Sequence, residues 1–271
     1  MNAQAPYPSR EEIANFFQTT TMVIENTPSM VYNAFIKKAV KDNWNVTPYE
    51  FITMEKLREK HEKEKFSFLL LARTNFENDK NSIDYYYLNL LMGGNEEEIT
   101  RMPEIASIPL TYASDNKGAY VSYLPLFIDF IQQHAINVEE KMGKTSLQDL
   151  DYYNKNRKLL KHKTLLLTTD YLPGGMDTIE LKKYYPSNIH FVTLEEVKSA
   201  IKQRRENTVV LHHVGPPADE PAGRAYNLLI GTDDARIYYY NSHKISEKNP
   251  DTMLKNDFRR IKWKIKLSNL F

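Results

Sequence analysis

The stretch LHHVGPPADEPAGRAY, which begins at Leu211, gathers the residue types most often used for metal or acid–base chemistry. His212 and His213 end an apolar run, and Asp219, Glu220 and Arg224 follow in a proline-rich segment. A histidine beside a carboxylate can bind a divalent metal or transfer a proton. Neighbouring residues of a strand point to opposite faces, so one ion cannot easily take both histidines. A metal-binding or proton-transfer site could therefore use one of the two histidines together with the loop carboxylates. We favour the simpler interpretation, in which a strand leaves its sheet into a proline-stiffened turn.

Other polar and aromatic motifs also have structural explanations. GTDD at 231–234 resembles a carboxylate ligand pair, but between two strands it predicts a hairpin turn. LPGGM at 172–176 lies where a phosphate could bind, and a plain loop is favoured. KNDFRRIKWKIKL, at 255–267, is basic with one tryptophan, yet its strict alternation of apolar and basic residues predicts a half-buried strand. The tyrosine runs at 85–87 and 238–240 predict sheet packing, with a carbohydrate- or peptide-binding surface as the alternative.

The composition excludes several classes of function. Of 271 residues, 41% are hydrophobic and 26% are charged, which is typical of a globular protein. The formal net charge is +1, so no global field draws the chain to nucleic acid, and we expect no nucleic-acid partner. The chain has no cysteine, which excludes disulfides, cysteine–zinc sites and thiol catalysis. It has no apolar run of about 18 residues that could span a membrane. No dinucleotide, P-loop, GxSxG or HExxH motif is present, so we predict neither a cofactor nor a metal.

The amino-terminal residues bear on localisation. Ala3-Gln4-Ala5 fits the small-x-small end of a secretory signal whose apolar region is missing, although Pro6 is a poor residue to follow a cleavage site. The resulting expectation is an exported protein, periplasmic or secreted, whose signal peptide has been removed.

An internal repeat organises the rest of the chain. FITMEKLREKHEKEKFSFLLLAR, from Phe51, and FVTLEEVKSAIKQRRENTVVLHHV, from Phe191, match at an offset of 140 residues. Further along, NLLMG at 89–93 matches NLLIG at 227–231 at an offset of 138 residues. His212 and His213 stand opposite an alanine and an arginine, so the shared letters favour packing over chemistry. A repeat at this spacing predicts two copies of one structural unit.

Each copy predicts the element order β-α-β-α-β-β-β-α. Strands that alternate with helices imply parallel pairing, and the last, closely spaced strands add as an antiparallel meander. The fold class is therefore α/β, a tandem duplication with mixed sheets flanked by helices. We place an N-terminal extension at 1–19, the first α/β repeat at 20–140, a helical connector at 141–162 and the second α/β repeat at 163–271. A short helix is expected within SREEIANFFQ in the extension.

Two local expectations concern helices. In PSMVYNAFIKKAVKDNW the spacing predicts one apolar face, formed by Val31, Phe35, Ala39 and Val40. The second helix of the second copy begins with a complete capping box, Thr193 to Glu196. The equivalent start in the first copy, at Thr53, lacks the acidic residue that closes the box.

In its Lys-, Asn- and Tyr-rich, cysteine-free composition and its NAQAP start, the chain resembles the uncharacterised secreted proteins of Bacteroidetes. The order of elements in each copy is also similar to the N-terminal module of TolB-like periplasmic proteins and to anticodon-binding-type α/β modules. Element order alone implies a fold and transfers no function.

Two hypotheses of function follow. The leading one is an exported, non-catalytic binding or scaffold protein that recognises a protein, peptide or glycan partner, because the duplication keeps fold-making residues and no polar site. The alternative is a hydrolase-like or metal-dependent enzyme with one site in the second repeat, built from His212 or His213 with Asp219, Glu220 and Arg224.

Overall fold

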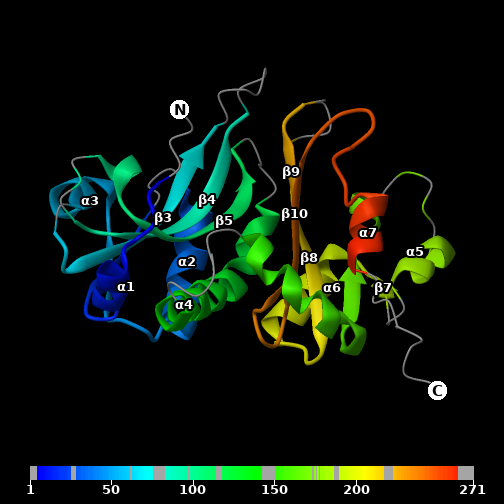
Figure 1. Ribbon diagram of the computed structural model, residues 1–271, viewed down its shortest axis with the longest axis horizontal. Coiled ribbons are helices and arrows are strands. Elements are labelled where there is room, and N and C mark those ends of the chain that lie inside the picture. The colour runs from blue at the N-terminus through cyan, green and yellow to red at the C-terminus, as the bar shows by residue number, and fades with distance from the viewer. Residues whose placement is uncertain are drawn as a thin grey trace. The chain divides into compact units, whose positions relative to one another are not determined.

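A computed structural model of the chain describes residues 5–25, 29–61, 63–75, 83–94, 96, 98–113, 118–141, 150–172, 174, 176, 178–185, 189–216 and 222–261. The chain divides into two compact units, Met1–Asp149 and Leu150–Phe271 (Figure 1). The boundary falls inside the predicted connector, whose residues 142–149 lie outside the described ranges. Lys141 ends a helix of the first unit, and residues 150–162 form a 3-10 helix of the second unit.

The first unit follows the predicted element order after one leading helix. Its helices and strands are α1 (Arg10–Phe16), β1 (Thr20–Ile24), α2 (Met30–Asn43), β2 (Tyr49–Ile52), α3 (Met54–Lys60), β3 (Phe66–Thr74), β4 (Tyr85–Met92), β5 (Glu104–Tyr112) and α4 (Leu124–Lys141). Short 3-10 helices precede β5 and α4: η1 (Ile99–Arg101) and η2 (Ala119–Tyr123).

The second unit repeats the series. It begins with the 3-10 helix η3 (Leu150–His162) and continues with β6 (Thr164–Leu167), η4 (Thr169–Tyr171), α5 (Thr178–Tyr184), β7 (Ile189–Phe191), α6 (Leu194–Lys202), β8 (Thr208–Val214), β9 (Arg224–Gly231), β10 (Ile237–Lys244) and α7 (Lys255–Ile261). The strand predicted for the last basic segment falls on residues 262–271, outside the described ranges.

Both units contain a five-stranded mixed sheet with the same topology. The strand order is β2-β1-β3-β4-β5 in the first sheet and β7-β6-β8-β9-β10 in the second. In each sheet the first three strands are parallel and the last two are antiparallel additions. The α/β class and the duplicated module are thereby confirmed.

Residues that match between the two repeats do not all occupy equivalent positions in the two sheets. In the first sheet Asn89 pairs with Leu70, whereas in the second Asn227 pairs with His213, three residues further along β8 than an offset of 140 would place it. An odd shift moves a side chain to the other face of a sheet. Asn89 therefore lies on the α3 face with Leu70, and Asn227 lies on the α5/α7 face with Leu229. The matched letters NLLMG and NLLIG are not structurally equivalent.

The helix starts agree with the capping signals. Thr193 accepts a hydrogen bond from the Glu196 N–H, and the Glu196 side chain accepts one from the Thr193 N–H. At Thr53 the cap makes no such side-chain hydrogen bond, as its incomplete box predicts. α1 lies within the expected amino-terminal helix and begins with a capping box of Ser9 and Glu12.

The predicted apolar face of α2 is only partly correct. Tyr32, Ile36, Ala39 and Val40 are buried, but Val31 is 58% exposed and Phe35 44% exposed. The buried stripe is displaced from the predicted one because Tyr32 and Ile36 occupy the centre of the face that packs on the sheet and on α4. Val31, Phe35 and Met30, which is 84% exposed, form an apolar patch on the first half of the helix.

The outer edge of β10 is covered by side chains of η3. The Asn154 amide accepts a hydrogen bond from the Tyr240 N–H (2.8 Å) and donates one to the Tyr240 carbonyl (3.0 Å). Asn156 donates to the Ile237 carbonyl at 2.8 Å. The Asn154 amide thus pairs with both main-chain groups of Tyr240, as a residue of a neighbouring strand would. The described part of the connector serves as an edge cover for the second sheet.

The outer edge of β5 in the first sheet is protected differently. The register between β4 and β5 shifts twice, which indicates irregular pairing along this strand. Pro109 lies within β5 and has no N–H to offer, and the Glu104 N–H donates to the Pro6 carbonyl at 2.8 Å.

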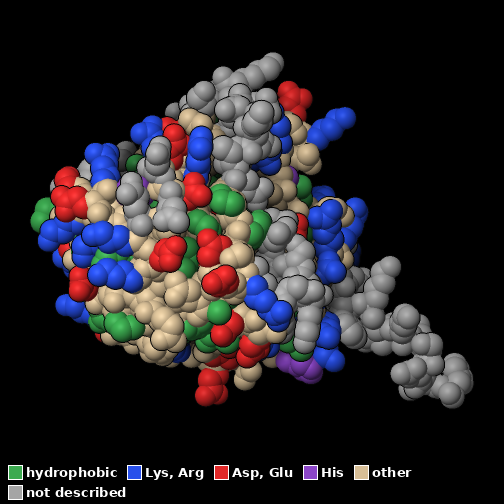
Figure 2. All heavy atoms as spheres, turned by 60° about the vertical axis from the view of Figure 1, so that its left-hand side comes forward, with side chains coloured by type: hydrophobic (Ala, Val, Ile, Leu, Met, Phe, Trp, Pro, Cys, Tyr) green, Lys and Arg blue, Asp and Glu red, His purple; other side chains and the backbone are tan. Residues whose placement is uncertain are grey.

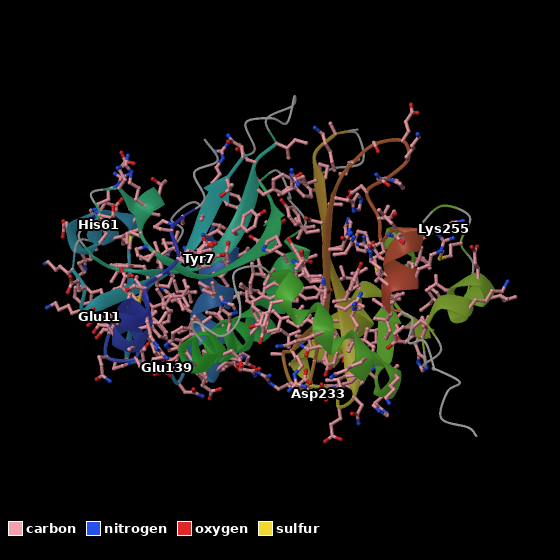
Figure 3. The ribbon with its side chains drawn as sticks, in the orientation of Figure 1. Tyr7, Glu11, His61, Glu139, Asp233 and Lys255 are labelled. Carbon is pink, nitrogen blue, oxygen red and sulfur yellow. The ribbon has the colours of Figure 1, made fainter. Side chains whose placement is uncertain are left out.

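Figure 3 shows the side chains around both sheets. On the surface facing the viewer in Figure 2, basic and acidic side chains are interspersed.

Two buried titratable groups of the first unit have opposite effects on its stability. Burial raises the pKa of Glu104 to about 7, and the Ser107 hydrogen bond lowers it less. Burial lowers the pKa of His134 to about 4, against a weaker effect of its bond to the Ile105 carbonyl. As the pH falls, the folded Glu104 takes up a proton and stabilises the fold, whereas the unfolded His134 takes up a proton and favours unfolding. The two effects oppose each other between about pH 4.5 and 6.5.

None of the helices in the described ranges is both long enough and apolar enough to cross a bilayer.

We expect Asn154→Ala to lower the free energy of unfolding by about 1–3 kcal/mol, because it leaves the N–H and C=O of Tyr240 without their partner. The freed edge should also increase association of the protein. Urea unfolding and sedimentation velocity measure the two effects. Lys158→Ala, an exposed change in the same helix, is the control and should alter neither quantity.

We expect Glu104→Gln to stabilise the protein at pH 8 and to have little effect at pH 4.5. The raised pKa of Glu104 means that its contribution to stability is complete below about pH 4.5 and is lost as the pH rises through 7, a difference of at most about 3 kcal/mol. Urea unfolding at intervals between pH 4.5 and 8 gives the difference between variant and parent. Glu59→Gln, an exposed change, is the matched control. A difference between Glu104→Gln and parent that does not change with pH would show that the pKa of Glu104 is not raised in the fold.

Candidate functional site

The second sheet places His212 and His213 on opposite faces. β8 is an apolar strand until its carboxyl end, where His212 pairs with Leu228 and His213 with Asn227. His213 shares its face with Leu211, which packs with the residues of α5 and α7. His212 lies on the other face and is 3% exposed. The expectation that one ion could not take both histidines agrees with this geometry.

His213 is the centre of a buried polar cluster. Its Nδ1 lies 2.8 Å from Asn227 Oδ1, and its Nε2 lies 2.9 Å from Asp251 Oδ1. The ring stacks on Tyr171 with a centroid distance of 4.3 Å. The His213 side chain is 3% exposed and that of Asp251 30%, so the contact runs from the interior to the surface. We refer to His213, Asn227, Asp251 and Tyr171 as the His213 cluster.

Both ring nitrogens of His213 are engaged by neighbouring side chains. The Asp251 carboxylate only accepts, so Nε2 of His213 donates to it. Nδ1 lies against the side-chain amide of Asn227, whose Nδ2 also lies 3.4 Å from the Thr252 carbonyl. In this arrangement the ring connects β8, β9 and the loop 245–254.

Loop 245–254 is held across the carboxyl end of the sheet by several strands and by η4. His243 of β10 has its Nε2 at 2.9 Å from the Pro250 carbonyl, and the Met253 N–H donates to the Tyr171 carbonyl at 3.1 Å. Gly215, just after β8, makes room for this loop, because a Cβ there would overlap the Asp251 carboxylate. A side chain at position 215 would therefore separate Asp251 from His213.

The structure brings two residues to His213 that were not among the expected site residues, Asn227 and Asp251. Asp219 and Glu220 lie outside the described residues, and Arg224 begins β9, where it pairs with Lys244. Sequence reasoning missed Asn227 and Asp251. Asn227 was hidden because its letters match the first copy, which suggested a role in packing. Asp251 is far from His213 in sequence, and only Gly215, which follows β8 closely, hints at the approach of another segment.

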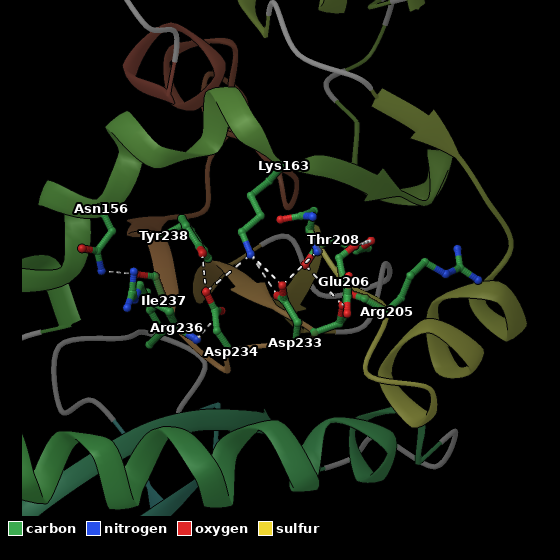
Figure 4. Close-up of polar contacts among 12 residues, drawn as sticks. Asn156, Lys163, Arg205, Glu206, Thr208, Asp233, Asp234, Arg236, Ile237 and Tyr238 are labelled. Carbon is green, nitrogen blue, oxygen red and sulfur yellow. Dashed lines mark hydrogen bonds and ion pairs between the residues drawn. The ribbon is translucent and has the colours of Figure 1, made fainter.

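The acidic pair at 233–234 lies in the β9–β10 turn, as predicted, and is tied into the fold (Figure 4). Lys163 Nζ lies 2.9 Å from Asp233 Oδ1 and 3.4 Å from Asp234 Oδ2. Tyr238 donates its hydroxyl to Asp234. Burial opposes ionisation of Asp233, but hydrogen bonds from Lys163 and from the Asn207 N–H outweigh it and lower the pKa of Asp233. These carboxylates close the amino end of the parallel strands.

The remaining motifs lie mostly in packing positions. Tyr85, Tyr238 and Tyr239 are buried, and the main chain of Tyr240 is covered by Asn154. In the predicted loop at 172–176, residues 173 and 175 lie outside the described ranges. Among the residues that the structure describes, no group of three or more His, Cys, Asp or Glu side chains could hold a metal ion.

Comparison of the chain with protein-family models, with curated proteins and with solved structures gave no match.

We expect Gly215→Ala to lower the free energy of unfolding by about 1–3 kcal/mol, because the added methyl group displaces Asp251 and leaves a buried N–H of His213 without its acceptor. Urea unfolding gives the stability, and the ring signals of His213 in NMR spectra report the broken contact. Gly94→Ala is the matched control, since a Cβ there meets nothing within 4 Å. Equal effects of the two substitutions would contradict the assigned role of Gly215.

Proposed function

We propose that the chain is a non-catalytic binding or scaffold protein that acts in the periplasm or outside the cell and recognises a protein, peptide or glycan partner. The observation that carries the proposal is that both ring nitrogens of His213 are hydrogen-bonded within the fold, to Asn227 and to Asp251. The best candidate for chemistry in the sequence is thereby occupied in holding loop 245–254 in place.

Surface features support a binding role. Met30, Val31 and Phe35 are exposed together on α2, and contiguous apolar surface commonly marks an interaction site. The fold is present twice, yet among the described residues of the first unit no cluster equivalent to the His213 cluster is found, and Asn89 lies on the opposite face of its sheet. Duplication without a duplicated polar cluster favours recognition over catalysis.

A second candidate is a hydrolase-like enzyme with one site in the second unit. His213 and Asp251 form a close pair near the carboxyl end of β8, and ligands of open α/β sheets bind at that end. A carboxylate that orients a histidine is also a common catalytic arrangement. For this chemistry a ring nitrogen of His213 must be freed from Asn227 or from Asp251. Releasing Asp251 requires loop 245–254 to move.

One set of measurements distinguishes the two candidates. Purified full chain and its His213→Gln variant are incubated with chromogenic esters, phosphate esters and glycosides, and both are analysed for bound metal. In parallel, the parent chain is applied to a glycan array and to a peptide display library. We expect binding to a glycan or peptide that His213→Gln reduces by less than about threefold, and no turnover. Turnover or a stoichiometric metal ion that disappears in the variant would overturn the proposal. Fractionation of the source cells tests the export.

A further inference from the structure

The four outer edges of the two sheets are not equally protected. The edge of β10 is covered by Asn154 and Asn156, and β5 contains Pro109 and two register shifts. The edge strand β7 has three residues, which is too short to template much pairing. β2 is the remaining edge. It is also short, with four residues, but within the described residues it has neither an asparagine cover nor a proline or register shift inside the strand.

The ladder between β1 and β2 determines which main-chain groups of β2 point outward. Thr21 N–H donates to the Pro48 carbonyl at 2.8 Å, and Glu25 N–H donates to the Ile52 carbonyl at 2.9 Å. In a parallel ladder the intermediate bonds then involve Glu50, so the main-chain groups of every second residue face β1. The N–H and C=O groups of Tyr49 and Phe51 consequently face away from the sheet. Within the described part of the chain, no hydrogen-bond partner meets them.

The side chains beside this edge form a firm, partly apolar border. Tyr49 and Phe51 are half-buried, and their rings meet edge to face with centroids 5.6 Å apart. Lys37 of α2 lies over the Phe51 ring at 5.9 Å and pairs with Glu25 at 2.9 Å. Lys37 is held beside the strand by Glu25 and by the Phe51 ring. Its positive charge therefore flanks the outer edge of β2 and does not cover it.

We propose that the outer edge of β2 receives an extended peptide segment of a partner protein, which adds to the first sheet as a sixth strand through the main-chain groups of Tyr49 and Phe51. This inference rests on the proposed binding function and assigns it a partner class. Strand addition uses main-chain hydrogen bonds for affinity and alternate side chains for specificity. The fitting segment has an apolar residue that packs on the Tyr49–Phe51 pair and polar residues on either side of it. With two outward residues available, the affinity should be modest, in the micromolar range.

The test uses the full chain and a phage library of random dodecapeptides, from which selected peptides are synthesised. Amide exchange is then followed by NMR with and without saturating peptide. We expect the amides of Tyr49 and Phe51 to exchange about tenfold more slowly in the complex. Those of Glu50 and Ile52 should change little, because they already lie in the ladder with β1. This measurement requires no variant and therefore does not depend on how a substitution folds.

Substitutions provide the second arm. Phe51→Pro removes the outward N–H while leaving the ladder residues Glu50 and Ile52, and proline is tolerated on the open side of an edge strand. Phe51→Val is the matched control, since it shortens the same side chain but keeps the N–H. We expect at least about tenfold weaker peptide binding for Phe51→Pro than for Phe51→Val. Tyr49→Pro and Tyr49→Val form the replacement pair if Phe51→Pro loses its circular dichroism spectrum.

Each other result overturns the inference in a recognisable way. Selected peptides that protect other amides, or that bind Phe51→Pro as well as Phe51→Val, remove the edge as the site and leave the proposed binding function intact. A dimer of the chain that Phe51→Pro dissociates would mean that the occupant is a second copy. Binding to glycans with no peptide selected would refute strand addition alone. His213-dependent turnover without any binding partner would refute both proposals.

Discussion

An open β-sheet leaves a row of N–H and C=O groups along each edge, and the need to pair or shield these groups shapes both units. Unpaired edges invite association with other chains. In the second unit the Asn154 amide satisfies both main-chain groups of Tyr240, so a segment predicted as a connector becomes part of the sheet's border. In the first unit Pro109 and the irregular pairing of β5 serve the same purpose. The two copies share one topology but protect corresponding edges by different means.

The same sheet geometry places the polar residues of the second unit. Side chains alternate between faces, so the register of β9 against β8 decides which groups meet. With Asn227 opposite His213, an amide and an imidazole lie on the face covered by α5 and α7, and loop 245–254 brings Asp251 to them. The equivalent letters in the first unit place Asn89 on the other face, where it contacts Glu104 and Ser107. The difference in strand register therefore places the matched asparagines in different surroundings: Asn227 joins the His213 cluster, whereas Asn89 contacts Glu104 and Ser107.

The second unit is tied at both ends of its parallel strands. At the amino end Lys163 joins the β9–β10 turn to the start of β6 through two carboxylates. At the carboxyl end His213 connects β8 and β9 to loop 245–254. Buried polar groups cost free energy unless they are paired, and pairing them restricts the alternatives open to the chain. Both clusters therefore stabilise the fold of the second unit. A catalytic role for His213 would require the His213 cluster to open.

Element order, strand directions and the starts of α3 and α6 could be derived from the sequence because they depend on local patterns. The capping box at Thr193 and the hairpin at 231–234 are examples, since the residues that specify them are neighbours in the chain. Errors arose where a pattern has two solutions a residue or two apart. The apolar stripe of α2 was placed on Val31 and Phe35, which are exposed, because Tyr32 and Ile36 satisfy the same spacing.

By itself the sequence determined that this chain is an α/β protein built twice, because periodicity and turn signals are encoded over a few residues. Only the tertiary structure decided which polar groups meet. Asp251 lies 38 residues from His213 in the sequence and contacts it in the fold. Asn227 meets His213 through a β8–β9 register that differs from the one implied by the match between the two repeats. The tertiary structure likewise decided that Asn154 closes one sheet edge while the main-chain groups of Tyr49 and Phe51 face outward on another. Such contacts depend on how distant segments pack, and no local pattern records the result.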